Sequence, residues 1–372
     1  LRTFNILSPH SIVRDTPTIE NIYLHAHASI HAATSVSQVT LHPHATIRNA
    51  CTVSQVLLQW NASIADHSTI TETILMEEAA SGPNSFVASS VLGPDVHVSA
   101  GEIHASLIGP NTNAHHQSLL IGVLWPAGRG NVGYGANVGS NHTGRLPDQE
   151  TVAAEGTFWG LSCVVKMPVN LIDAPYSIVA AGTVIAPGQN IAMPFSLLVD
   201  GSILPGWVCH SSPYTLARSA TKFATRRKAV RHSYYTGWQI LRPQVVEQCV
   251  WARRALMSVD VATTTKAVQP VYKGDKDIPG IGSQNLTEKG RQTGIRAYTD
   301  CIQRFALQGF LTFLMNAKKQ NAATTLDDTF LTKEFVLSVE RVALSSYAQD
   351  GVGIGWGAMP WDAVDESGLW KY

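Results

Sequence analysis

The segment LHAHASIHAATSVSQVT, residues 24–40, is followed at once by LHPHATIRNACTVSQVL, residues 41–57, which repeats its pattern at a spacing of 17 residues. Four further rows of the same kind begin at Leu7, Leu58, Leu75 and Leu92. Within a row, aliphatic residues recur after six, six and five positions. This spacing is neither the 3.6-residue period of an α-helix nor the strict alternation of an ordinary half-buried strand.

The columns of this alignment indicate which side chains face a core. The first column is always leucine, the fifth is small in most rows, and the seventh and thirteenth are mostly Val or Ile. This is the hexapeptide pattern of a parallel β-helix, whose coils must stack because a single coil cannot bury its apolar side alone. The sequence therefore predicts a mainly β protein: a left-handed parallel β-helix of about ten coils over residues 1–206, followed by an α-helical C-terminal domain.

Beyond residue 108 the repeat is harder to follow. We expect excursions from the β-helix near residues 117–130 and 145–157. Between them, GNVGYGANVGSNHTGRLPDQE, residues 130–150, resumes the hexapeptides and packs glycine, asparagine and charged residues closely together. Glycine permits positive φ and close backbone approach, and irregular segments on a rigid scaffold commonly carry functional sites. We therefore predict the functional site here.

The predicted site joins this segment to a preceding histidine pair, because stacked coils lie only about 4.8 Å apart. His142 or His116 is the expected general base, and Asp148 or Glu150 would orient it. Arg145 would hold a phosphate or carboxylate group. The predicted catalytic residues are His142, His116 and Asp148. The predicted substrate-binding residues are His115, Gly135, Asn137, Asn141, Arg145, Gln149, Glu150 and Lys166. No metal ligand is assigned.

The second half of the chain differs from the first in charge. Residues 1–212 contain 6 Lys and Arg against 13 Asp and Glu, a balance of −7, whereas residues 213–372 contain 21 against 14, a balance of +7. This asymmetry indicates two differently built parts. We predict a helical domain over 207–347 with an extended linker near 260–284, and an irregular docking tail over 348–372.

A basic segment, residues 218–232, belongs to the first predicted helix and its continuation. It could bind a phosphate-bearing ligand, pair with the acidic β-helix or form a solvated face. No RNA-binding motif accompanies it, so nucleic acid is a less favoured partner.

The cysteines and the hydropathy of the sequence indicate in which cellular compartment the protein works. The five cysteines, Cys51, Cys163, Cys209, Cys249 and Cys301, are odd in number and contain no CxxC pair, which argues against a disulfide framework and a zinc ribbon. An intracellular, reducing compartment, the cytoplasm or an organelle matrix, is expected. No apolar run reaches the roughly 20 residues of a membrane-spanning helix, so no membrane association is expected.

The segments HHQSLL (115–120), GNVGYGANVGSNHTGRLPDQE and APYSIVAAG (174–182) resemble an uncharacterised hexapeptide-repeat family of bacteria and some protists. The wider superfamily includes acyltransferases, nucleotidyltransferases and zinc carbonic anhydrases. The resemblance implies an acyl or nucleotidyl transferase acting on a sugar, nucleotide-sugar or acyl substrate. Acyl-CoA or a nucleotide sugar is then the expected cofactor, ahead of zinc, and a homo-oligomer or a subunit of a larger assembly is the expected state.

Two alternatives remain open. A rigid β-helix with flat faces also suits a non-catalytic scaffold or assembly subunit. A zinc enzyme of the carbonic anhydrase kind would use three histidines, for which His104, His116 and His142 are candidates, although their spacings of 12 and 26 are not those expected of that group.

Overall fold

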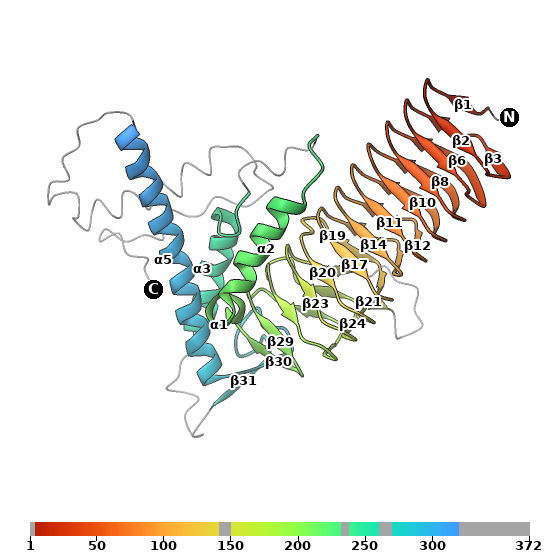
Figure 1. The fold of residues 1–372 in the computed structure, drawn as a ribbon. Helices are drawn as coiled ribbons and strands as arrows, with labels where there is room; N and C mark the ends of the chain where they lie inside the picture. Colours follow the sequence, from red (N-terminus) through yellow and green to blue (C-terminus); the bar gives the residue numbers. More distant parts are fainter. Residues whose placement is uncertain (1–3, 141–149, 232–237, 260–269, 320–372) are drawn as a thin grey trace.

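The computed structural model describes residues 4–140, 150–231, 238–259 and 270–319. It is a mainly β protein in which a parallel β-helix of about 11 turns is followed by helices (Figure 1). This confirms the predicted fold class, a mainly β chain with a parallel β-helix followed by an α-helical region.

One side of the β-helix, called face 1, carries one short strand from each coil, and these strands pair in parallel. They are β2 (Ile12–Arg14), β5 (Ser29–His31), β7 (Thr46–Arg48), β9 (Ser63–Ala65), β11 (Ala80–Gly82), β14 (His97–Ser99), β17 (Asn113–His115), β20 (Asn131–Val132), β23 (Phe158–Trp159), β26 (Ile178–Val179) and β29 (Leu197–Val199).

The other two sides, faces 2 and 3, share three long strands that turn from one face to the next: β6 (Ser35–Leu41), β8 (Thr52–Leu58) and β10 (Thr69–Leu75). The remaining strands of face 2 are β3 (Thr18–Glu20), β12 (Phe86–Ala88), β15 (Glu102–His104), β18 (Leu119–Ile121), β21 (Asn137–Ser140), β24 (Val164–Lys166) and β27 (Val184–Ile185). Those of face 3 are β1 (Ile6–Leu7), β4 (Tyr23–Leu24), β13 (Val91–Leu92), β16 (Leu107–Ile108), β19 (Val123–Trp125), β22 (Thr151–Val152), β25 (Val169–Asn170) and β28 (Gln189–Asn190).

The register of these strands follows the sequence repeat. Leu24 pairs with Leu41, and Leu41 pairs with Leu58, so the leucine column forms one stack whose three members are fully buried. At the corner that follows, His27 and His44 have φ of 62° and 65°. A single left-handed residue is a compact way to turn the chain, and histidine is among the residues that adopt this conformation more often than most.

The predicted excursion near 117–130 is mostly regular coil, because this stretch contains β18 and β19. Leu120, Val123 and Trp125 point inward and are fully buried, while Leu119 and Leu124 lie on the outside. Apolar residues on both sides hid the repeat in the sequence. The predicted excursion at 145–157 likewise contains β22, which pairs with both β19 and β25; residues 145–149 lie outside the described residues.

Three further strands extend the C-terminal end of the β-helix, and one of them, β31, lies within the expected linker. β30 (Ser202–Leu204) pairs antiparallel with β29, β32 (Asn285–Thr287) pairs with β30, and β31 (Val271–Lys273) pairs with β32. The sequence near 260–284 was expected to be an extended linker. Its described part contributes β31 to the sheet, and Ile281 bridges to Ile191.

The helices are α1 (Trp207–Ser211), α2 (Pro213–Arg226), α3 (Pro243–Met257) and α5 (Glu288–Lys319). Proline stands at the start of α2 and α3, where its missing N–H costs nothing. α3 and α5 pack against each other. None of the described helices is both long enough and apolar enough to cross a membrane. The last part of the predicted helical domain, residues 320–347, and the predicted tail, residues 348–372, lie outside the described residues.

Candidate functional site: a basic cleft between the β-helix and α2

A cleft of about 710 Å³ lies between face 1 and helix α2. Its volume is typical of small-molecule sites. In Figure 1, α2 runs beside the part of the β-helix that carries β17, β20 and β23. The β-helix side is lined by His97, Ser99, Asn113, His115 and Asn131 from the strands and by Asp95, Asn111 and His116 from the corners. The other side is lined by Lys222, Phe223, Thr225 and Arg226 of α2 and by Lys228.

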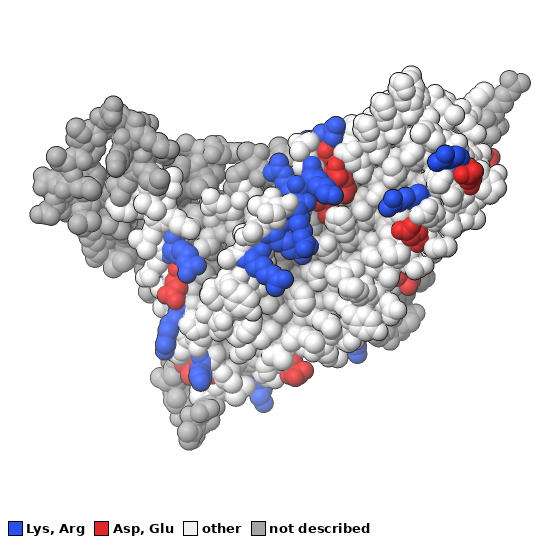
Figure 2. Space-filling model, viewed as in Figure 1, with Lys and Arg blue, Asp and Glu red and all other residues white. Residues whose placement is uncertain are grey.

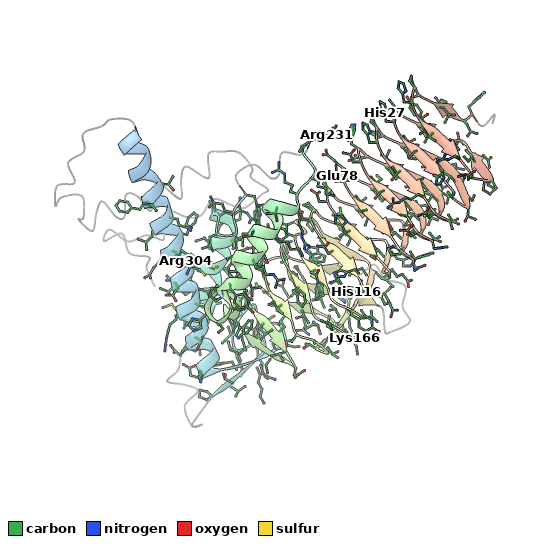
Figure 3. All side chains as sticks on the ribbon, in the orientation of Figure 1. His27, Glu78, His116, Lys166, Arg231 and Arg304 are labelled. Carbon is green, nitrogen blue, oxygen red and sulfur yellow. The ribbon has the colours of Figure 1, made fainter. Side chains whose placement is uncertain are left out.

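The chain that follows α2 is fixed to acidic residues of the β-helix corner. The backbone N–H groups of Lys228 and Ala229 donate to Asp95 at 2.9–3.3 Å. Arg231 donates to Glu77 from its backbone at 2.9 Å and from its guanidinium at 2.7 Å, and it lies 4.8 Å from the centre of the Trp60 ring. Part of the basic segment 218–232 is therefore paired with the acidic β-helix, which is one of the interpretations that its sequence left open. Figure 3 shows Arg231 reaching toward the corner that carries Glu78 and His27.

The cleft has a positive electrostatic environment. Among the described residues, no carboxylate forms an ion pair with Lys222, Arg226 or Lys228, since every described ion pair involves other groups. The pKa of Lys222 is lowered by burial and by the neighbouring charges of Arg226 and Arg218. Mutual repulsion of this kind is relieved when an anion binds. Figure 2 shows Lys and Arg side chains gathered in a band over α2 and the segment after it.

Two histidines facing these cations have lowered pKa values. For His97 the causes are burial first and then the charge of Lys228, partly opposed by Asp95. For His115 burial again comes first, and His116 and Lys222 add to it. Both imidazoles are therefore mainly neutral at pH 7, which is the state required of a general base.

The neighbours of His115 orient its ring. Its Nε2 lies 3.3 Å from Oδ1 of Asn131, and its ring centre lies 4.2 Å from that of His116. In the tautomer in which Nε2 donates to the Asn131 oxygen, Nδ1 carries the lone pair that can accept a proton.

The structure brings only part of the predicted site to this cleft. His115 and His116 line it. Gly135 lies at the same corner one coil further on, where its N–H donates to the carbonyl of His116 at 3.1 Å. Asn137 lies around the corner at the start of β21 on face 2, and Lys166 ends β24 on that same face (Figure 3).

Of the other predicted site residues, the structure describes only Glu150, which does not line the cleft. Glu150 is exposed and directly precedes β22. His142, Asp148, Asn141, Arg145 and Gln149 lie outside the described residues, and their roles stay predictions.

The strands of face 1 and helix α2 supply the cleft residues that sequence reasoning missed. His97, Asn113 and Asn131 occupy equivalent positions of three successive coils, and they pair in register. Lys222 and Arg226 are four residues apart and so share one side of a helix. Both patterns were visible in the sequence, but nothing local indicated that the two elements meet.

Much of the glycine in residues 130–150 serves coil stacking. A Cβ on Gly130 would overlap the Trp125 ring, and a Cβ on Gly139, whose φ is 84°, would overlap the carbonyl oxygen of Ile121. These two glycines are required by packing between neighbouring coils, without any ligand.

Comparison with known proteins gives a limited result. No protein-family model matches the chain. An uncharacterized protein of Treponema pallidum (strain Nichols) is 29% identical to it over 143 residues, which cover 35% of this chain and 18% of that protein. The chain thus matches less than a fifth of the length of this relative.

Proposed function

We propose that the protein is a transferase whose acceptor, a sugar or nucleotide sugar bearing a phosphate or carboxylate, binds in the cleft between face 1 and α2. One observation carries the proposal: the same cleft holds three cations without described ion pairs and two histidines whose pKa values are lowered. Cations bind the anionic part of an acceptor, and a neutral imidazole can activate its hydroxyl or amine.

The positions of the residues in the cleft suggest a role for each. Lys222, Arg226 and Lys228 hold the anionic group from the helix side. His115, held through Nε2 by Asn131, takes the proton from the acceptor through Nδ1 as the acceptor attacks the donor. With acyl-CoA the new bond forms to the acyl carbon, the C–S bond breaks and CoA leaves; with a nucleotide sugar it forms to the nucleotidyl phosphorus, the P–O bond breaks and the sugar phosphate leaves. This role moves the catalytic base from the predicted His142 or His116 to the residue beside His116, while the predicted transferase class is retained.

The test combines donors, acceptors and one substitution. The protein is incubated with acyl-CoA or nucleotide-sugar donors and a panel of phosphorylated or carboxylated sugars, and products are detected by mass spectrometry. We expect His115→Ala to slow transfer at least about 100-fold, the usual contribution of a general base. His27→Ala, at an exposed corner away from the cleft, is the matched control. Equal rates in the two variants would remove His115 from the mechanism.

A scaffold remains the second candidate, because face 3 exposes a row of apolar side chains in the middle of the β-helix. Ile74, Leu107 and Leu124 lie in one register row and are each about two fifths exposed. An exposed apolar row of this kind suits an assembly contact. Sedimentation of the wild type and of Leu107→Asp tests it, since a contact through face 3 would be weakened by the charge.

The zinc alternative finds no support in the described part of the chain. There, no three His, Cys, Asp or Glu side chains are placed to hold a metal ion together. His104 lies on face 2 with its Nε2 2.8 Å from Glu102, away from the cleft.

A further inference from the structure

The cations beside the cleft form a line that is longer than the cleft itself. Arg218, Lys222 and Arg226 follow one another at intervals of four residues on α2, so they share one side of the helix at about 6 Å intervals along its axis. Lys222 and Arg226 line the cleft, whereas Arg218 lies one turn beyond it. Lys228 extends the line at the other end, and the band is visible in Figure 2. A ligand that uses all four charges must be elongated and must carry several anionic groups.

The wall opposite this line offers neutral hydrogen-bonding groups. Three successive coils, about 4.8 Å apart, present Ser99, Asn113 and Asn131 to the cleft. A hydroxyl and two carboxamides both donate and accept hydrogen bonds, which matches the hydroxyl groups of a carbohydrate.

The described lining of the cleft lacks the exposed aromatic rings that bind single-stranded nucleic acid. Phe223 is the single Phe, Tyr or Trp among the described lining residues, and its side chain is buried edge-to-face against Trp238, with 5.3 Å between ring centres. Bases bound without sequence preference are normally stacked on exposed aromatic rings.

We propose that the cleft binds a linear acidic oligosaccharide, with its sulfate or carboxylate groups along the line from Arg218 to Lys228 and its hydroxyls on the wall formed by Ser99, Asn113 and Asn131. This inference deepens the proposed function, on which it rests for the role of the oligosaccharide as the transfer acceptor. The binding itself requires no catalytic step.

Binding is measured by isothermal titration calorimetry with sulfated and carboxylated octasaccharides and with the corresponding disaccharides. We expect Arg218→Gln to weaken octasaccharide binding about fivefold, the effect of one exposed ion pair, and to leave disaccharide binding unchanged. Lys222→Gln is expected to weaken both, because Lys222 lies within the cleft. The control is Arg48→Gln, which removes an exposed cation that does not line the cleft.

Three results would overturn the inference: equal binding of a neutral octasaccharide, equal or tighter binding of a single-stranded oligonucleotide of the same charge, or no effect of Arg218→Gln on binding of the octasaccharide.

The catalytic proposal can fail independently of the binding inference. If acidic octasaccharides bind as expected but no donor transfers a group to them or to smaller sugars, the transferase is wrong and the binding site stands. If small nucleotide sugars are turned over while no octasaccharide binds, the inference alone fails.

Discussion

Glu155 joins the β-helix to the helical region through one buried carboxylate. It is 4% exposed and accepts hydrogen bonds from Arg129 at 2.9 Å, from the Trp238 indole at 2.6 Å and from Arg242. The Arg129 guanidinium also lies 4.7 Å from the centre of the Trp238 ring. Two guanidinium groups thus contact the same buried carboxylate, so the loss of its charge is costly in this position.

Glu155→Gln keeps the size of the side chain and removes its charge. We expect the free energy of unfolding to fall by about 3 kcal/mol, measured by urea denaturation, because the ion pairs of Glu155 with Arg129 and Arg242 are both lost in a largely buried position. The exposed Glu150→Gln serves as control and should stay within about 0.5 kcal/mol of the wild type. A loss at Glu155 no larger than that of the control would show that the carboxylate is not needed for stability.

The proposed cleft residues were only partly indicated by the sequence. His115 and His116 were recognised because they stand next to each other before a glycine-rich segment. His97 was not, since a lone histidine on a strand gives no local sign of its neighbours. Its pKa is lowered by burial and by the charge of Lys228, which is 131 positions away in the chain and comes near it only in the folded protein.

At the level of the coil, the leucine column contains both a buried and an exposed leucine. Leu41 is fully buried between Leu24 and Leu58, whereas Leu7 occupies the same column in the first coil and is 56% exposed. The backbones above and below Leu41 are fixed by parallel pairing, so a cavity there has little room to collapse.

Leu41→Ala should therefore lower the free energy of unfolding by about 3–5 kcal/mol, the upper part of the range for buried leucine. Leu7→Ala should cost less than about 1 kcal/mol, because most of its surface is already in water. Urea denaturation of both variants provides the comparison. Similar losses at the two positions would mean that the first coil is covered in solution.

A ladder of aromatic rings runs along one corner of the first coils. Tyr23 lies 4.4 Å from His25, His25 lies 4.9 Å from His42, and His42 lies 4.6 Å edge-on from Trp60, each between ring centres. The pKa of His42 is lowered by burial and by the neighbouring His25. The unfolded chain consequently binds a proton at His42 more readily than the folded protein does.

The lowered pKa of His42 makes the free energy of unfolding depend on pH. The contribution of His42 is fully present above its ordinary pKa of 6.5 and is lost as pH falls from there through the lower pKa of the folded protein. We expect the difference in unfolding free energy between pH 7.5 and pH 5.5 to be smaller in His42→Gln than in the wild type. Glutamine is chosen because Gln59 occupies the equivalent position of the next coil. An unchanged or larger difference would refute the role of His42.

For the molecule as a whole, the sequence predicted the architecture better than the site. Six rows of one pattern impose the same inward column, and parallel stacking is the arrangement that buries it, so the β-helix followed from local spacing. Where α2 lies against that β-helix depends on long-range contacts such as the hydrogen bonds from Lys228 and Ala229 to Asp95. No periodicity encodes such contacts, so nothing in the sequence indicated that α2 lines a cleft with face 1. The predicted roles of His142, Arg145 and Asp148, which lie outside the described residues, stay predictions.

The central claim is that the cleft between face 1 and α2 is the ligand-binding site. Hydrogen–deuterium exchange with and without a saturating sulfated octasaccharide tests it most directly. The account predicts slower exchange in β14, β17 and α2, with β5 and β7 unchanged. Slower exchange confined to β21 and β24, or no change anywhere in the protein, would contradict it.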